Sequence, residues 1–205
     1  MTSGTGYHHG DLPNALRRAA VDVIDERGLG SFSLREVARR AGVSHTAPAH
    51  HFGDVRGLLT SVASEGFDAL HAALTEALDA VGDPVERLIA IGEAYVKLAR
   101  SNHAHCEVMF RVDVVDPNDP QLQLAGMRAY GVLEDTMRSL IETEDLDVDL
   151  DDATWLCWST MQGLVALGPK LDVIAHHHGR PEPSSAALVR RFTSLIVAGL
   201  RSARA

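Results

Sequence analysis

The fold of this chain is decided by residues 31–59, which read SFSLREVARRAGVSHTAPAHHFGDVRGLL. Ser33 is placed to cap a short helix, and Glu36, three residues on, would complete a capping box. Gly42 is placed to end that helix. The apolar residues expected on its buried face recur at helical spacing and are Leu34, Val37, Ala38 and Ala41.

A second short helix is predicted from a Ser44 cap to about residue 51. Two short helices that cross closely need a small residue where they touch and a glycine where the chain reverses. Ala38 and Gly42 meet these needs, so the segment has the pattern of a helix-turn-helix. Val43 and Phe52 are expected to fill the core behind the second helix.

The second helix is expected to present its exposed side chains to the major groove of DNA, which is wide enough for one helix. The predicted contacts on this helix are His45, Thr46, Ala47, Ala49 and His50. Helix starts favour anions because their backbone N–H groups are free. The predicted contacts at helix starts and nearby cationic positions are Ser33, Arg35, Ser44, His51 and Arg56.

His51 and two further arginines of the segment also have a structural interpretation. His51 is expected to pack against the start of the following helix, with its other ring nitrogen free to meet a phosphate. Arg39 and Arg40 fit either a phosphate contact or an ordinary solvated surface, because an exposed arginine needs no function.

Residues 1–60 resemble the DNA-binding domain of TetR-type transcriptional regulators. That family has a three-helix module that closes on a His-Phe pair and is followed by a Leu-Leu start to its fourth helix. The residues that match this pattern are His51, Phe52, Leu58 and Leu59. The opening residues 7–12 resemble the arm and first-helix start of one branch of the family.

Two positions depart from the family pattern. The family usually has Tyr where this chain has Ala49, and Lys or Arg where it has Val55. Both family residues commonly contact phosphates, so two backbone contacts are expected to be missing here. Pro48 is expected about four residues into the second helix, early enough that its missing N–H is tolerated.

The remainder of the chain predicts helices only, and therefore an all-α protein. A first helix runs from about Leu12 to Gly28, and a long helix begins near Asp54. Breaks near residues 82, 102, 116–120, 142–152 and 179–185 divide the rest into about five helices. We expect a DNA-binding domain over 1–60 and a ligand-binding and dimerisation domain over 61–205, joined rigidly by the long helix.

Charge differs between these two parts. The net charge is −9 overall, but residues 1–60 carry +1 and residues 61–205 carry −10. The segment 31–58 has four arginines against two acids, a local positive excess that suits phosphate binding. No apolar run approaches the length of a membrane helix, so we expect a cytoplasmic protein without a membrane partner.

Two helices of the acidic part predict association between copies of the chain. Residues 155–167 are apolar on every side of a helix, apart from three polar side chains. The last helix combines apolar residues with small ones that allow close approach. Two such helices from each subunit would form a four-helix interface, in agreement with the homodimer that the TetR resemblance implies.

The resemblance also implies a small-molecule inducer of unknown identity. Residues 158–163 resemble the Trp-x-x-x-His-Gly signature of one TetR C-terminal class, with Gln162 in place of His. Apolar and aromatic walls with a few polar groups are typical of ligand sites, although each such residue also fits an ordinary core. The pocket candidates are Tyr95, Cys106, Met109, Phe110, Tyr130, Trp155, Trp158, Met161 and Gln162.

Other chemistry has little support in the sequence. Residues 176–178 are all histidine, but consecutive helical residues diverge by about 100°, so a solvated helix end or loop is expected there. No phosphate loop, zinc-protease pair or nucleophile elbow occurs, so we expect no enzyme activity and no cofactor. Two alternatives remain: a helical metal- or ligand-binding protein whose first module does not read DNA, and an enzyme using His103 and Cys106.

Overall fold

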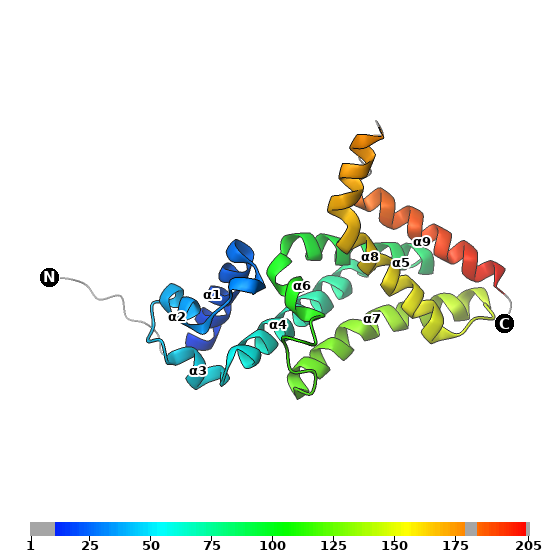
Figure 1. Cartoon of the computed structure of the whole chain (residues 1–205). Helices are drawn as coiled ribbons and strands as arrows, with labels where there is room; N and C mark the ends of the chain where they lie inside the picture. Colours follow the sequence, from blue (N-terminus) through cyan, green and yellow to red (C-terminus); the bar gives the residue numbers. More distant parts are fainter. Residues whose placement is uncertain (1–10, 179–183, 204–205) are drawn as a thin grey trace. The chain divides into compact units, whose positions relative to one another are not determined.

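The computed structural model describes residues 11–178 and 184–203 of the 205-residue chain (Figure 1). Every regular element within those ranges is helical, which confirms the all-α prediction. The predicted arm at residues 7–12 lies largely outside the described residues. In chain order the elements are α1 (Leu12–Arg27), the 3₁₀ helix η1 (Leu29–Ser31), α2 (Leu34–Ala41), α3 (Ala47–Phe52), α4 (Val55–Ala77), α5 (Pro84–Ser101), α6 (His103–Met109), α7 (Pro120–Glu144), α8 (Leu150–His177) and α9 (Ser185–Ser202).

The described chain forms two compact units. The first comprises residues 11–66 and 103–124, and the second comprises residues 67–102 and 125–203 with the gap noted above. Residues 103–124 belong to the first unit through long-range hydrogen bonds. The Ala104 N–H donates to the Asp25 carboxylate at 3.0 Å, and the Asp116 N–H donates to the Thr60 hydroxyl at 2.8 Å.

The first unit has an apolar core between α1, α2 and the first half of α4. The face of α1 predicted from periodicity is buried from Leu16 to Ile24, while Leu12 is half-buried. Val37 of α2 and Leu58 of α4 have no exposed surface. Removing these side chains from water supplies the main stabilisation of the module.

Local hydrogen bonds determine where the helices begin. Asp83 caps α5 by accepting the N–H groups of Val85 and Glu86, and Asp54 accepts the N–H of Gly57 at the start of α4. The breaks predicted at residues 82, 102 and 116–120 coincide with helix boundaries.

The second unit is built around the packing of α5 against α8 and α9, which lie together in Figure 1. Close approach depends on Gly92 of α5. A methyl group at this position would lie 2.9 Å from the Cγ1 atom of Val189 and 3.4 Å from the sulfur of Met161. Glycine is therefore required by packing here, although it weakens a helix intrinsically. Within the described residues, no helix is both long enough and apolar enough to span a membrane.

Candidate nucleic-acid interface

The turn between α2 and α3 has the geometry that the sequence predicts. Gly42 adopts a left-handed conformation with φ of +68°, and the Val43 N–H donates to the Ala38 carbonyl at 3.0 Å. Ala38 is buried where α2 packs, whereas Val43 is only half-buried. A side chain at Gly42 would strain the backbone, because L-residues rarely adopt this conformation.

The start of α2 shows one half of the predicted capping box. The Glu36 N–H donates to the Ser33 hydroxyl at 3.4 Å. The Glu36 carboxylate is bound instead by two guanidinium groups, those of Arg39 and Arg27. The reciprocal half of the box was therefore a wrong expectation, since charged donors compete better for a carboxylate than a backbone N–H.

The helix predicted from Ser44 to about residue 51 corresponds to α3, which starts later than predicted. It begins at Ala47, with Thr46 in the N-cap position, and no side chain forms a capping hydrogen bond. The predicted Ser44 cap is therefore wrong. The Ser44 hydroxyl lies 3.1 Å from that of Thr46 instead. Pro48 is consequently the second helical residue rather than the fourth, where its missing N–H breaks no helical bond. Pro48 is also the buried residue of α3, and Phe52 is only half-buried.

The outer surface of α3 and of the turn before it consists of short and polar side chains. His45, Thr46, Ala49 and His50 are exposed, while Ala47 is half-buried. His51 is exposed as well, which corrects the expectation that it packs against the start of α4. The rings of His50 and His51 meet edge to face, with centroids 5.4 Å apart.

Arginines near this surface differ in how they are paired. Arg40 binds Glu26, and Arg27 and Arg39 bind Glu36. Arg35 is exposed and has no ion-pair partner among residues 11–178 and 184–203. Its charge is therefore available to an external anion.

Arg56 and Val55 lie at the start of α4. The Arg56 side chain is exposed and donates to the Val112 carbonyl at 3.4 Å, and its charge also acts on the nearby carboxylate of Asp113. Val55 is 39% exposed, so the position usually occupied by Lys or Arg in the TetR family lies at the surface.

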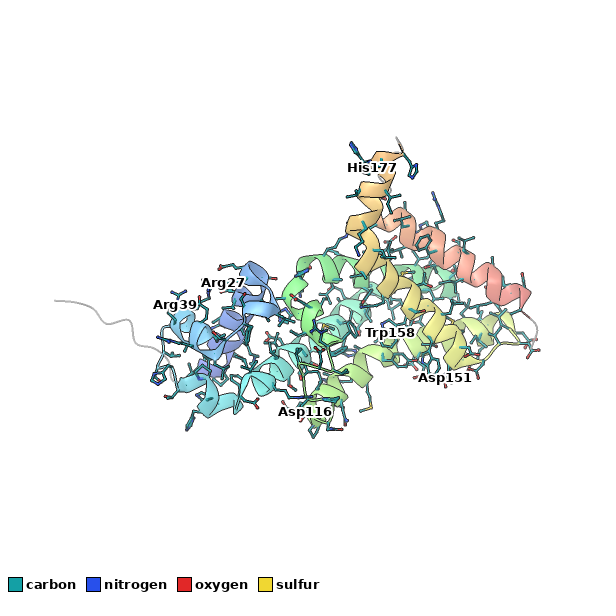
Figure 2. All side chains as sticks on the ribbon, viewed as in Figure 1. Arg27, Arg39, Asp116, Asp151, Trp158 and His177 are labelled. Atoms are coloured by element: carbon teal, nitrogen blue, oxygen red, sulfur yellow. The ribbon has the colours of Figure 1, made fainter. Side chains whose placement is uncertain are left out.

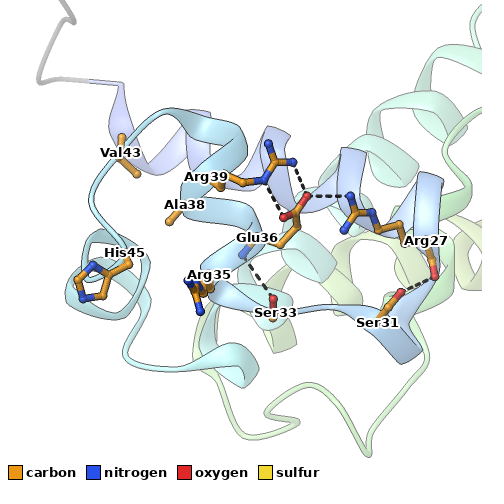
Figure 3. A pocket seen from close by; sticks show the side chains of 9 residues that line it. All are labelled: Arg27, Ser31, Ser33, Arg35, Glu36, Ala38, Arg39, Val43 and His45. Carbon is orange, nitrogen blue, oxygen red and sulfur yellow. Dashed lines mark hydrogen bonds and ion pairs between the residues drawn. The ribbon is translucent and has the colours of Figure 1, made fainter.

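An open groove of about 420 Å³ lies beside α2 and the turn that precedes α3. Its charged lining comes from Arg27, Arg35, Glu36 and Arg39, and the side chains of His45, Ser31 and Ser33 also line it. Figure 3 shows Glu36 between the guanidinium groups of Arg39 and Arg27. The bond from Arg39, with the charge of Arg27 nearby, lowers the pKa of Glu36 to about 2.

The predicted inducer residues are distributed over both units. Cys106, Met109 and Phe110 belong to the first unit, and the other six belong to the second. Within the second unit the Tyr95 hydroxyl donates to the side-chain oxygen of Gln162. Met161, which precedes Gln162 in the sequence, is buried. Burial raises the pKa of the Cys106 thiol to about 11.

Three aromatic candidates lie toward the surface of the second unit. The rings of Tyr130 and Trp158 are 5.9 Å apart in an edge-to-face arrangement. Trp155 is 55% exposed and Trp158, labelled in Figure 2, is 38% exposed. His176 and His177 are the last residues of α8 and are exposed, as predicted for a solvated helix end.

The exposed third helix, its left-handed glycine turn and the cationic groove define a helix-turn-helix protein of the DNA-binding class. A family model described as bacterial regulatory proteins, tetR family, matches residues 16–62. A second model, the tetracyclin repressor-like C-terminal domain, matches residues 88–192, more than half of the chain. The chain therefore belongs to the tetR family, which confirms the resemblance inferred from residues 1–60.

Individual relatives agree with this assignment. The transcriptional regulator BetI of Yersinia pestis is 31% identical over 124 residues, which cover 58% of this chain and 63% of that protein. The chain thus matches less than two thirds of the length of this relative. The transcriptional repressor KstR2 of Mycobacterium tuberculosis is 26% identical over 161 residues, covering 69% and 76%. A structure of a protein of unknown function from Rhodococcus sp. RHA1 superposes with a TM-score of 0.80 at 27% identity, covering 97% and 100% of the two chains.

Proposed function

We propose that this chain is a homodimeric repressor that binds operator DNA through α3 and releases it when a small molecule binds. The observation that carries the proposal is the surface of α3 and of the turn before it, where exposed short and polar side chains lie near Arg35, an arginine with no ion-pair partner among the described residues. A surface of this kind supplies both base-edge contacts and phosphate contacts.

The proposed contacts divide into two groups. The base-reading residues are His45, Thr46, Ala47, Ala49 and His50, whose small or polar side chains suit hydrogen bonds and thymine methyl contacts. The residues proposed to contact phosphate are Ser33, Arg35, Ser44, His51 and Arg56. With Ala49 and Val55 in place of two usual phosphate contacts, the affinity depends strongly on Arg35.

The proposed dimer uses the outer faces of α8 and α9. Leu156 and Leu167 of α8 are about half exposed, and Gly163 between them has open space where a Cβ would be. On α9, Leu195 is 65% exposed and is flanked by exposed small residues. Apolar and small residues along one face favour close helix packing, so these faces support a four-helix interface between two subunits.

The inducer is proposed to bind in the second unit near the Tyr95–Gln162 pair. This pair offers a hydroxyl and an amide, and Met161, which precedes Gln162 on the same helix, is a buried apolar side chain. Tyr130, Trp155 and Trp158 are the aromatic candidates of the same unit. Cys106, Met109 and Phe110 belong to the first unit and are not assigned to this site. A ligand that prefers a conformer unable to place both α3 helices on DNA would lower operator affinity by its differential affinity for that conformer.

Repression is supported by the repressor KstR2 among the relatives. We propose a cytoplasmic location, because operator DNA is found in the bacterial cytoplasm. No catalytic role is proposed for His103 or Cys106, since the neutral thiol that burial favours is a poor nucleophile.

The test is a fluorescence-anisotropy titration of the purified chain with the DNA upstream of its own coding region, at two salt concentrations. The proposal expects saturable binding by a dimer that weakens as the salt rises. Arg35→Gln should reduce the slope of log K against log salt by about one unit per subunit. Absence of binding to every upstream fragment at low salt would contradict the proposal.

A further inference from the structure

The groove beside α2 contains an anion that belongs to the protein itself. The Nε and Nη2 atoms of Arg39 bind the two carboxylate oxygens of Glu36 at 2.9 and 2.6 Å. An Nη2 atom of Arg27 lies 3.2 Å from the same carboxylate. Two guanidinium groups around one anion is also the arrangement by which arginines bind phosphate.

We propose that Glu36 is a built-in competitor of DNA phosphate, which withholds Arg27 and Arg39 from the duplex and thereby lowers the sequence-independent part of the DNA affinity. The inference rests on the proposed function, because it assumes that DNA approaches the groove. It assigns Glu36 as a residue that sets the phosphate affinity of the first unit through Arg27 and Arg39.

The position of Glu36 makes this competition effective. Its side chain is only 15% exposed, whereas Arg39 is 65% exposed on the outer side of the pair. Glu36 remains ionised at physiological pH because its pKa is about 2. An incoming phosphate would therefore have to displace a carboxylate that stays in place and repels it.

The consequence falls on sequence-independent affinity. Lysine and arginine contacts to phosphate supply essentially all non-specific binding, whereas base-edge contacts of α3 supply sequence discrimination. Holding two arginines back lowers binding to any duplex and leaves the α3 contacts unchanged. Because the same phosphate contacts are lost on operator and on random-sequence DNA, the affinity falls for both, and base-edge contacts supply a larger share of the binding that remains.

The experiment measures binding of the full chain to a random-sequence duplex across a fourfold range of salt. Glu36→Gln should make the slope of log K against log salt steeper by about 0.9 per newly contacted phosphate. With one new contact per subunit of a dimer, the affinity gain at the lowest salt should be roughly tenfold larger than at the highest.

Arg39 supplies the second arm of a double-mutant cycle. Arg39→Gln in the wild-type chain should leave the slope unchanged, because the Nε and Nη2 atoms of Arg39 are already bound to Glu36. The same substitution in the Glu36→Gln chain should remove the gain. The matched control is Glu26→Gln, which removes an equal charge but releases Arg40, a residue that does not line the groove.

Three results would overturn the inference. One is an unchanged slope for a folded Glu36→Gln chain, and another is an equal change for Glu26→Gln, which would reflect net charge alone. The third is a reduced slope for Arg39→Gln in the wild-type chain. This last measurement decides the question even if Glu36→Gln does not fold. If the wild-type protein binds no duplex, the proposed function is contradicted. If the wild-type protein binds and the variants have the same salt slope as the wild type, only the role of Glu36 is contradicted.

Discussion

The dimer face predicts the effect of one substitution on α9. Leu195 is 65% exposed in the single chain and lies among small exposed residues. Complete burial of a leucine is worth about 1.5–3 kcal/mol, so covering this exposed fraction contributes about 1–2 kcal/mol per subunit. A dimer has two such positions, and loss of about 2–4 kcal/mol raises the dissociation constant by at least roughly 30-fold. Leu195→Arg also places a charge in the interface, which adds to the cost.

The assay is sedimentation velocity over a dilution series, with circular dichroism to show that the variant is folded. The control is Met127→Arg on α7, because Met127 is 64% exposed in the same unit but lies on a different helix. We expect Leu195→Arg to become monomeric at concentrations where Met127→Arg and the wild-type chain are dimeric. A Leu195→Arg chain as dimeric as the wild type, or a dimer broken equally by Met127→Arg, would refute the proposed interface.

Three further predictions concern stability. Gly92→Ala should lower the free energy of unfolding by about 1–2 kcal/mol, because the new methyl group meets Val189. Gly131→Ala has open space around the new methyl group and should raise the free energy of unfolding by up to about 1 kcal/mol. Thermal melts test both. The lowered pKa of Glu36 means that its contribution is complete above about pH 4.5 and is lost toward pH 2, so acid titration of Glu36→Gln should show a weaker dependence in that range. The raised pKa of Cys106 means that stability falls between about pH 9 and 11, and Cys106→Ala should lack that component in alkaline melts.

The sequence predicted those features that depend on short-range patterns. Helical periodicity placed the buried face of α1, and the glycine at position 42 placed the turn, because each needs only neighbouring residues. Family resemblance extended this to the whole first module. The extent of α3 was predicted less well, because Ser44 and Thr46 are both acceptable starts locally and burial of Pro48 against the module selects the shorter helix.

Other features depend on contacts between residues distant in the sequence. The Asp25 carboxylate binds the Ala104 N–H across 79 positions, so no local pattern assigns residues 103–124 to the first unit. Spacing alone allows a bond between Glu36 and Arg39 three residues on, but the approach of Arg27 from α1 requires the packed module. Arg35 has no ion-pair partner among the described residues, and this could not be predicted before the ion pairs of the neighbouring arginines were known.

The central claim is that α3 reads DNA, and its most direct test is binding of the upstream operator fragment by a chain with His45→Ala, Thr46→Ala and His50→Ala. All three side chains are exposed, so the variant should fold and dimerise normally. We predict that its operator affinity falls to that for random-sequence DNA, while the wild-type chain prefers the operator. Retention of wild-type operator preference by the triple variant would contradict the account.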